Sequence, residues 1–132
     1  MLRGLNHITI AVSDLERSLH FYIDIVGMRG HVRWDNGAYL SLGEVWFCLS
    51  CDKVKPSQDY SHIALDIDEA DFPTFSRLLK DAGVIEWKVN SSEGLSAYFL
   101  DPDGNKLEAH GGSLQTRLNS LKNKPYSGLF WL

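Results

Sequence analysis

A loose internal repeat constrains the fold of this chain more than any other feature of its sequence. Residues 7–15 have the sequence HITIAVSDL, and residues 62–70 have the sequence HIALDIDEA. Each segment opens with a histidine, continues as a short alternating strand and ends in an acidic helix start. Duplicated modules are usually related by pseudo-symmetry, so equivalent positions can converge on one point. Converging imidazoles from His7 and His62 would suggest a metal site.

Length and composition limit the classes of protein to consider. The 132 residues fit a single domain, 1–132, or two small modules that share a core. A net charge of −4 argues against a nucleic-acid partner. The first residues carry no apolar segment typical of a secretory signal, and no apolar run approaches the roughly 18 residues of a membrane span. We therefore expect a cytoplasmic protein without a membrane partner.

The first module, residues 1–51, has the pattern of a βαβββ unit. A strand near 5–12 leads to Ser13–Glu16, which has the Ser-x-x-Glu form of a capping box, and Gly27 is a plausible end of the helix. Three short strands should follow, the first two joined by a hairpin turn at Asn36-Gly37. The helix should have one apolar face, formed by Leu15, Leu19, Tyr22, Ile23 and Val26.

The second module, residues 61–112, repeats this order after a polar linker at residues 52–60. Its helix should begin near Asp68, carry Pro73 in its first turn and end at Gly83. The inward residues of that helix are expected to be Phe72, Phe75, Leu78 and Leu79. The other expected elements are strands at 61–67, 84–89, 97–100 and 106–110, a polar loop at 90–96, a tight turn at 101–104, and a C-terminal helix and tail at 113–132. Two such modules predict an α+β fold of paired βαβββ units.

The only cysteines, Cys48 and Cys51, have the C-x-x-C spacing of a redox pair or half a zinc site. A redox pair normally lies at a helix N-terminus, where the dipole lowers the thiol pKa. These two follow Val45-Trp46-Phe47 and should end a strand, and no second pair is present to complete a zinc site. We interpret them as strand residues.

A third metal ligand is needed beside the two repeated histidines, and Glu108 is the best candidate. It lies in the last strand of the second module, on the face opposite Leu107 and Ala109. A buried carboxylate must be paired or metal-bound, although an outward-facing edge residue would need neither. His110 shares the face of Glu108 and could be its partner or a competing ligand. Two imidazoles and a carboxylate suit Mn, Fe, Ni or Zn.

The loop at 90–96 is a second candidate site. Its small or polar residues recur at every second position, and their oxygens could surround a monovalent cation, although a solvated loop without a ligand has the same pattern. These residues are Asn90, Ser92, Gly94 and Ser96. Lys88 and Arg117 could recognise an anion beside a metal, or could be ordinary surface charges. Four aromatic residues of the strands are expected to line the cavity: Trp34, Tyr39, Trp46 and Tyr98.

Several segments resemble the vicinal oxygen chelate superfamily, and within it the fosfomycin-resistance glutathione transferases of the FosA type. The superfamily resemblance rests on the two βαβββ modules and on residues 6–9, 34–40, 46–50, 59–62 and 98–104. The more specific resemblance is carried by residues 87–99 and by Arg117-Leu118 with Pro125-Tyr126. Residues 111–119 also resemble the bacillithiol-using and hydrolytic members, and the potassium-type loop favours glutathione.

The resemblance implies a domain-swapped homodimer that adds glutathione to the epoxide of fosfomycin. It implies that Mn(II) is held by His7 of one chain and by His62 and Glu108 of the other. It assigns K⁺ to Asn90, Ser92, Gly94 and Ser96, and the phosphonate to Thr9, Lys88, Ser92, Ser96, Tyr98 and Arg117. It gives Tyr39 a role in deprotonating the thiol, with Thr9 beside it in the catalytic site, and places glutathione at Trp34, Asn36 and Ser50.

Two alternatives stay open at this stage. One is another metal enzyme on the same scaffold, such as a ring-cleaving dioxygenase, glyoxalase I, or a fosfomycin-modifying enzyme that uses another thiol or water. Glyoxalase I needs a fourth protein ligand, and the corresponding strand offers Trp46 and Cys48 but no carboxylate. The other alternative is a metal-free protein of the same fold that binds a drug without modifying it.

Overall fold

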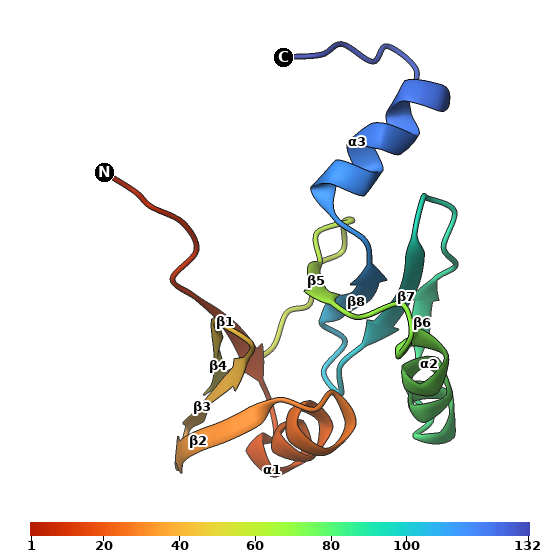
Figure 1. Ribbon diagram of the computed structural model, residues 1–132. Helices are drawn as coiled ribbons and strands as arrows, with labels where there is room; N and C mark the ends of the chain where they lie inside the picture. Colours follow the sequence, from red (N-terminus) through yellow and green to blue (C-terminus); the bar gives the residue numbers. More distant parts are fainter. The chain divides into compact units, whose positions relative to one another are not determined.

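The computed structural model describes residues 1–132 and divides into two compact units. Unit 1 comprises residues 1–61 and 100–106, and unit 2 comprises residues 62–99 and 107–132. Each unit contains one four-stranded sheet (Figure 1). No helix in the chain is both long enough and apolar enough to cross a membrane.

Unit 1 is a βαβββ module, as the sequence predicts. Its sheet has the strand order β1-β4-β3-β2, with β1 parallel to β4 and the other pairs antiparallel. Its elements are β1 (His7–Val12), α1 (Leu15–Leu19), η1 (His20–Ile25), β2 (Arg29–Trp34), β3 (Gly37–Leu42) and β4 (Val45–Cys51). The apolar side chains between helix and sheet include Val12, Phe21, Tyr22, Leu40, Phe47 and Leu49, all buried.

The helix of unit 1 differs from the prediction in two ways. Asp14, not Ser13, is the N-cap, because the Asp14 side chain accepts a hydrogen bond from the backbone N–H of Arg17. The expected capping box is therefore wrong, and the Ser13 hydroxyl donates instead to Asp103. After α1 the chain widens into the π-helix η1, in which the backbone N–H of Val26 donates to the carbonyl of Phe21.

Unit 2 repeats the βαβββ order and adds a C-terminal helix. Its sheet has the strand order β5-β8-β7-β6. The elements are β5 (Ile63–Asp66), α2 (Phe72–Asp81), β6 (Glu86–Lys88), β7 (Leu95–Leu100), β8 (Lys106–Gly111) and α3 (Leu114–Asn123). Ser113 caps α3, and its side chain and that of Thr116 bond each other's backbone N–H groups.

Helix α2 begins later and buries less than predicted. It starts at Phe72 rather than near Asp68, because residues Asp68–Asp71 form a turn in which the Asp71 N–H donates to the Asp68 carbonyl. Pro73 lies in the first turn, as expected. Leu79 is buried, but Leu78 is 42% exposed, so its predicted inward position is wrong.

The turn between β7 and β8 belongs to unit 1. Asp101 is buried, and its carboxylate accepts hydrogen bonds from the Tyr22 hydroxyl (2.7 Å) and from the backbone N–H groups of Asp103 (2.9 Å) and Asn105 (2.8 Å). Burial and the neighbouring Asp101 carboxylate raise the pKa of Tyr22 far above its ordinary value. Tyr22 therefore stays protonated and serves as a donor.

Candidate functional site

A hydrogen-bonded cluster around Glu108 is the central feature of unit 2. Glu108 lies on β8, is 6% exposed, and its Oε2 is 2.8 Å from Nε2 of His62. The hydroxyl of Ser96, on β7, donates to Glu108 Oε1 over 2.6 Å. His110, two residues along β8, places its Nδ1 at 2.7 Å from Ser96 Oγ and 3.3 Å from Glu108 Oε1. The alternation of β8 brings Glu108 and His110 to one face, as predicted.

The surroundings of Glu108 keep its carboxyl group ionised. Burial raises its pKa, but the hydrogen bonds from Ser96 and His62 and the charges of His110 and His62 outweigh burial and lower it below the ordinary value. A carboxylate must be deprotonated before it can bind a metal. The site therefore has a ligand in the required state at neutral pH.

His62 and Glu108 fit a divalent metal as two of its ligands. Their facing atoms are an imidazole nitrogen and a carboxylate oxygen, a donor pair that suits Mn, Fe, Ni and Zn. No set of three His, Cys, Asp or Glu side chains in the chain gathers into a group that could hold a metal ion. The structure thus brings together two of the three predicted ligands, and the third, His7, lies in unit 1.

His7 stands at the start of β1 with its ring held on two sides. Its Nδ1 lies 2.7 Å from Asn6 Oδ1, and its ring centroid lies 4.4 Å from that of Trp46 on β4. An amide oxygen can only accept a hydrogen bond, so Nδ1 carries the proton and Nε2 has the lone pair that a metal needs.

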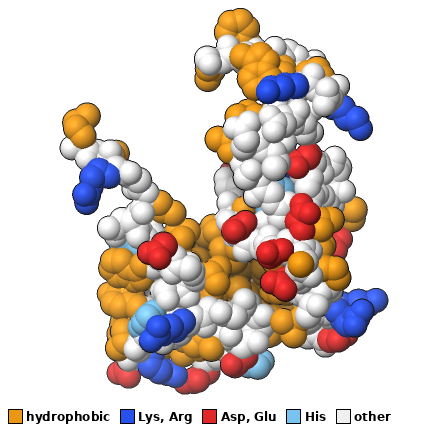
Figure 2. All heavy atoms as spheres, viewed as in Figure 1, with side chains coloured by type: hydrophobic (Ala, Val, Ile, Leu, Met, Phe, Trp, Pro, Cys, Tyr) orange, Lys and Arg blue, Asp and Glu red, His pale blue; other side chains and the backbone are white.

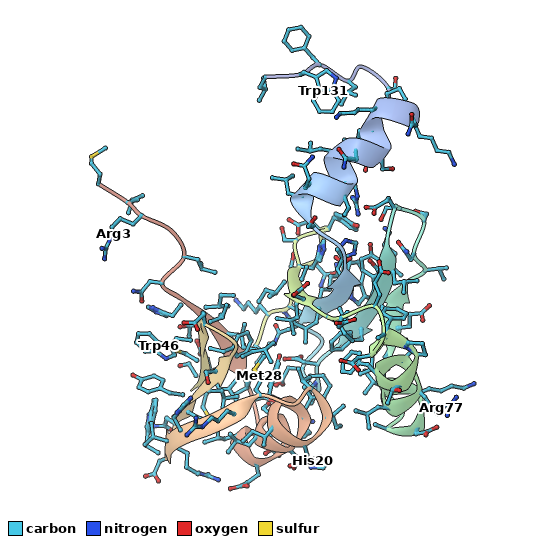
Figure 3. All side chains as sticks on the ribbon, viewed as in Figure 1. Arg3, His20, Met28, Trp46, Arg77 and Trp131 are labelled. Carbon is cyan, nitrogen blue, oxygen red and sulfur yellow. The ribbon has the colours of Figure 1, made fainter.

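An aromatic row crosses the sheet of unit 1 and ends at His7. Trp34, Tyr39 and Trp46 come from β2, β3 and β4, with ring centroids 4.8 Å and 5.2 Å apart along the row. Hydrophobic side chains lie on the surface around this sheet, and Trp46 projects from β4 (Figures 2 and 3). Each of the three rings is about 40% exposed, which leaves a broad apolar platform beside the histidine.

The strand register places the remaining predicted residues of unit 1 around this row. Thr9 pairs with Cys48, two residues beyond the pair formed by His7 and Trp46, so Thr9 shares the face of His7. Ser50 pairs with Gly37 at the end of β3 next to Trp34. Thr9 and Ser50 are exposed on that face.

The hairpin that carries Trp34 forms as predicted but through a different turn. Asp35 and Asn36 are the turn residues, neither has a positive φ, and Gly37 already pairs within β3. A Cβ at Gly37 would lie 2.6 Å from the Trp34 ring and 2.7 Å from the Leu49 carbonyl oxygen. The glycine is therefore required by the close approach of the Trp34 ring, not by the turn.

Both cysteines lie on β4, as the sequence predicts. Cys48 pairs with Tyr39, shares the face of the aromatic row and is buried, and both thiols are free. They are three residues apart in a strand and so point to opposite faces of the sheet.

The predicted cation loop is closed by its own hydrogen bonds. The Asn90 amide donates to the Gly94 carbonyl over 2.8 Å, and Asn90 Oδ1 accepts from the backbone N–H of Ser92 at 3.1 Å and its hydroxyl at 3.2 Å. Ser96 was expected in this loop, but β7 begins at Leu95 and the Ser96 hydroxyl bonds Glu108. The loop proper thus holds three of the four predicted oxygen donors.

The two predicted basic residues have ring or ionic partners. The Lys88 ammonium lies 4.5 Å from the centroid of the buried Tyr98 ring. Arg117 Nε lies 3.2 Å from Glu93 Oε2, and its Nη2 donates to the Glu93 carbonyl at 3.0 Å and to Ser92 Oγ at 3.4 Å. Burial lowers the pKa of Arg117, but its bond to Glu93 outweighs burial and the pKa stays above its ordinary value.

Glu93 is a site residue that the sequence interpretation missed. The available signal was an acidic residue inside a loop that is otherwise small and polar. Because Arg117 is far away in the chain, only the folded structure identifies it as the partner.

Four of the predicted site residues line a cavity of about 570 Å³ in unit 2. They are Lys88, Asn90, Ser96 and Tyr98. Apolar residues of α2, Phe72 and Leu79, line the same cavity. The Glu86 carboxylate lines it too, and Ser96 is the one member of the Glu108 cluster that reaches it.

Comparisons with a family model, with related sequences and with solved structures all give the same family. Residues 4–109 match the family model described as Glyoxalase/Bleomycin resistance protein/Dioxygenase superfamily. The chain is 51% identical to "Glutathione transferase FosA" of Serratia marcescens, over 98% of this chain and 95% of that protein. It is 38% identical to "Metallothiol transferase FosB" of Staphylococcus haemolyticus, over 98% and 99%.

Among solved structures, the fold resembles the fosfomycin resistance protein FosX. The FosX of Mesorhizobium loti has a TM-score of 0.79 and 31% identity, covering 89% of this chain and 99% of that one. A FosX variant from Listeria monocytogenes, complexed with Mn(II) and 1S,2S-dihydroxypropylphosphonic acid, has a TM-score of 0.82 and 26% identity, covering 89% and 99%. The chain belongs to the Glyoxalase/Bleomycin resistance protein/Dioxygenase superfamily and, within it, to the Fos proteins.

Proposed function

We propose that this protein is a metal-dependent transferase that inactivates fosfomycin by adding the thiol of glutathione to its epoxide. One observation carries the proposal: an ionised, buried Glu108 faces His62 at 2.8 Å and accepts a hydrogen bond from Ser96, which also lines a cavity with Lys88 and Tyr98. The 51% identity to a glutathione transferase supports the choice of thiol.

His7, His62 and Glu108 would hold Mn(II). His62 and Glu108 form a two-ligand centre in unit 2, and the remaining predicted ligand, His7, lies in unit 1. We propose that the partner subunit's His7 completes the site in a domain-swapped homodimer. A metal held there would supply a Lewis acid that stabilises negative charge developing on the epoxide oxygen.

The chain's own residues would bind and orient the phosphonate. Lys88 and Arg117 bring the positive charge, and Arg117 has the fork geometry that matches phosphonate oxygens. The hydroxyls of Thr9, Ser92 and Tyr98 would complete the hydrogen bonds, and Ser96, whose proton is donated to Glu108 Oε1, would line the phosphonate site. Holding the phosphonate fixes the epoxide carbon in line with the incoming sulfur.

Residues in and next to the aromatic row would bind glutathione and help to deprotonate its thiol. Trp34, Asn36 and Ser50 would bind glutathione along the exposed edge of the unit 1 sheet. Tyr39, between Trp34 and Trp46 in the row, would help to remove the thiol proton. The nucleophile comes from glutathione, so the reaction requires neither Cys48 nor Cys51 as a nucleophile.

We propose that K⁺ binds the loop of Asn90, Ser92 and Gly94 together with Ser96. The assignment is supported by the hydrogen bonds of Asn90 to Gly94 and Ser92, which hold three of the four oxygen donors in one short loop. A cation there would add positive charge near the phosphonate. Replacing K⁺ with Na⁺ should then lower the rate, and equal rates would argue against the loop site.

The test is mass spectrometry of fosfomycin incubated with the protein, Mn(II) and K⁺. Parallel reactions contain glutathione, bacillithiol, L-cysteine or water alone. A glutathione adduct that disappears when a chelator is added supports the proposal.

A related activity with another thiol or water is the second candidate, favoured by the similarity to FosB and FosX. A bacillithiol or cysteine adduct, or a diol, would replace glutathione by that co-substrate. If no reaction yields product while fosfomycin binds, the protein is a binding protein of the same fold.

A further inference from the structure

His110 touches two polar groups of the candidate site without belonging to the proposed ligand set. Its Nδ1 lies 2.7 Å from the Ser96 hydroxyl oxygen and 3.3 Å from Glu108 Oε1. Its side chain is 17% exposed. A histidine so placed needs a role of its own.

The Glu108 carboxylate determines the direction of both hydrogen bonds in the series His110–Ser96–Glu108. Glu108 is ionised and can only accept, so the single hydroxyl proton of Ser96 points to Glu108 Oε1. Ser96 Oγ must then accept from His110. His110 Nδ1 therefore carries a proton, and the relay runs from His110 through Ser96 to Glu108.

Two glycines leave the space that the His110 ring occupies. A Cβ at Gly94 would lie 2.9 Å from His110 Cε1, and a Cβ at Gly112 would lie 2.8 Å from His110 Nε2. Gly94 belongs to the cation loop, and Gly112 precedes the cap of α3. The ring is thus confined between two backbone segments, which fixes where Nδ1 points.

We propose that His110 is a positioning residue that aims the Glu108 carboxylate at the metal through Ser96. The inference rests on the proposed assignment of Glu108 as a metal ligand. Without the donated proton, Ser96 can turn its hydroxyl away and Glu108 Oε1 loses its anchor. Outer-sphere partners of metal ligands typically contribute about 10–100-fold to metal affinity.

The experiment compares the Mn(II) affinity of two variants of the full-length protein by electron paramagnetic resonance of free Mn(II). His110→Asn keeps an N–H donor near the position of Nδ1, whereas His110→Leu has similar bulk and no donor. We expect Leu to weaken Mn(II) binding by about 10–100-fold and Asn to stay within about threefold of wild type. A packing role alone predicts no advantage of Asn over Leu.

His31 offers a matched control pair. Its Nε2 lies 2.7 Å from Ser41 Oγ on the exposed part of the other sheet, the same type of bond without a proposed ligand behind it. His31→Asn and His31→Leu should both bind Mn(II) like wild type.

Gly112→Ala is a second test that leaves the imidazole chemistry intact. The added methyl group must displace the His110 ring, so Mn(II) affinity should fall in the wild-type background and not fall further in His110→Leu. Independent effects in the double variant would overturn the proposal, and so would equal affinities of His110→Asn and His110→Leu. Absence of Mn(II) binding by the wild-type protein would overturn it as well.

The outcome is separable from that of the proposed function. If the expected affinities are found but no fosfomycin–glutathione adduct forms, the proposed function fails and the role of His110 stands. If the adduct forms and the two His110 variants bind Mn(II) alike, the role of His110 fails and the function stands.

Discussion

The Tyr22 hydroxyl donates a 2.7 Å hydrogen bond to Asp101, a residue 79 positions away in the chain. Tyr22 is fully buried, and Asp101 is 5% exposed. Tyr22 lies in the π-helix η1, and Asp101 lies in the turn between β7 and β8. The same turn contains Asn105, whose amide donates to the Ala11 carbonyl at 3.1 Å. The turn residues therefore help to hold the first module together.

Tyr22→Phe should lower the free energy of unfolding by about 1–3 kcal/mol, because a buried carboxylate loses one of its donors while the ring packing is retained. Urea denaturation followed by fluorescence measures the change. Tyr39→Phe is the control, since this surface residue should change stability by less than about 0.5 kcal/mol. Equal effects of the two variants would show that the Tyr22 hydroxyl contributes nothing specific.

Glu108→Gln should abolish tight Mn(II) binding, because the amide has the shape of the carboxylate but not its charge. The loss should exceed the roughly 10–100-fold effect of an outer-sphere partner. Isothermal titration with Mn(II) measures it, with the exposed Glu44→Gln as control. Near-normal affinity in Glu108→Gln would remove Glu108 from the ligand set.

Asn6→Ala should weaken Mn(II) binding by about tenfold, because His7 loses the acceptor that keeps the proton on Nδ1. Asn6→Asp keeps an acceptor and should stay close to wild type. Nitrogen NMR of the His7 ring provides a second readout, since the Ala variant should show mixed tautomers. If alanine and aspartate behave alike, the Asn6 contact does not set the tautomer.

The carboxyl group of Asp59 should titrate with a pKa of about 2. The Ser57 hydroxyl, then the backbone N–H of Ser61, donate to its ionised form and lower the pKa. Because the folded pKa lies below the unfolded value of about 3.9, any stabilisation by these bonds is complete above that pH and is lost as the pH falls toward 2. Carbon NMR of the Asp59 carboxyl measures the pKa, and Ser57→Ala should raise it; an ordinary pKa in the wild type would contradict the expectation.

The sequence predicted the module order because its signals are local. Strand alternation and the repeated histidines locate β1 and β5, and the same alternation places Glu108 and His110 on one face of β8. Register then follows from the strands, which is why Thr9, Tyr39 and Trp46 share the face of His7.

The errors arise where a distant residue decides the local structure. Ser13 is a good capping residue in isolation, but its hydroxyl donates a hydrogen bond to Asp103 and Asp14 caps the helix instead. Ser96 was expected in the loop at 90–96, but it lies in β7, where its hydroxyl donates to Glu108. Glu93 has no visible role until Arg117 approaches it. These contacts depend on the folded chain and leave no trace in a short window of sequence.

The turn between β7 and β8 also determines where this chain can be divided. A cut in the linker at residues 52–60 would separate the repeats as they appear in the sequence, but it would leave the first fragment without Asp101 and Asn105, which are part of unit 1. Such a fragment would lack the acceptor of the Tyr22 hydroxyl and the donor to the Ala11 carbonyl, and only the other fragment carries them. A split version of this protein should therefore regain the native structure of unit 1 only when both fragments are mixed, because the first repeat does not contain the whole of that unit.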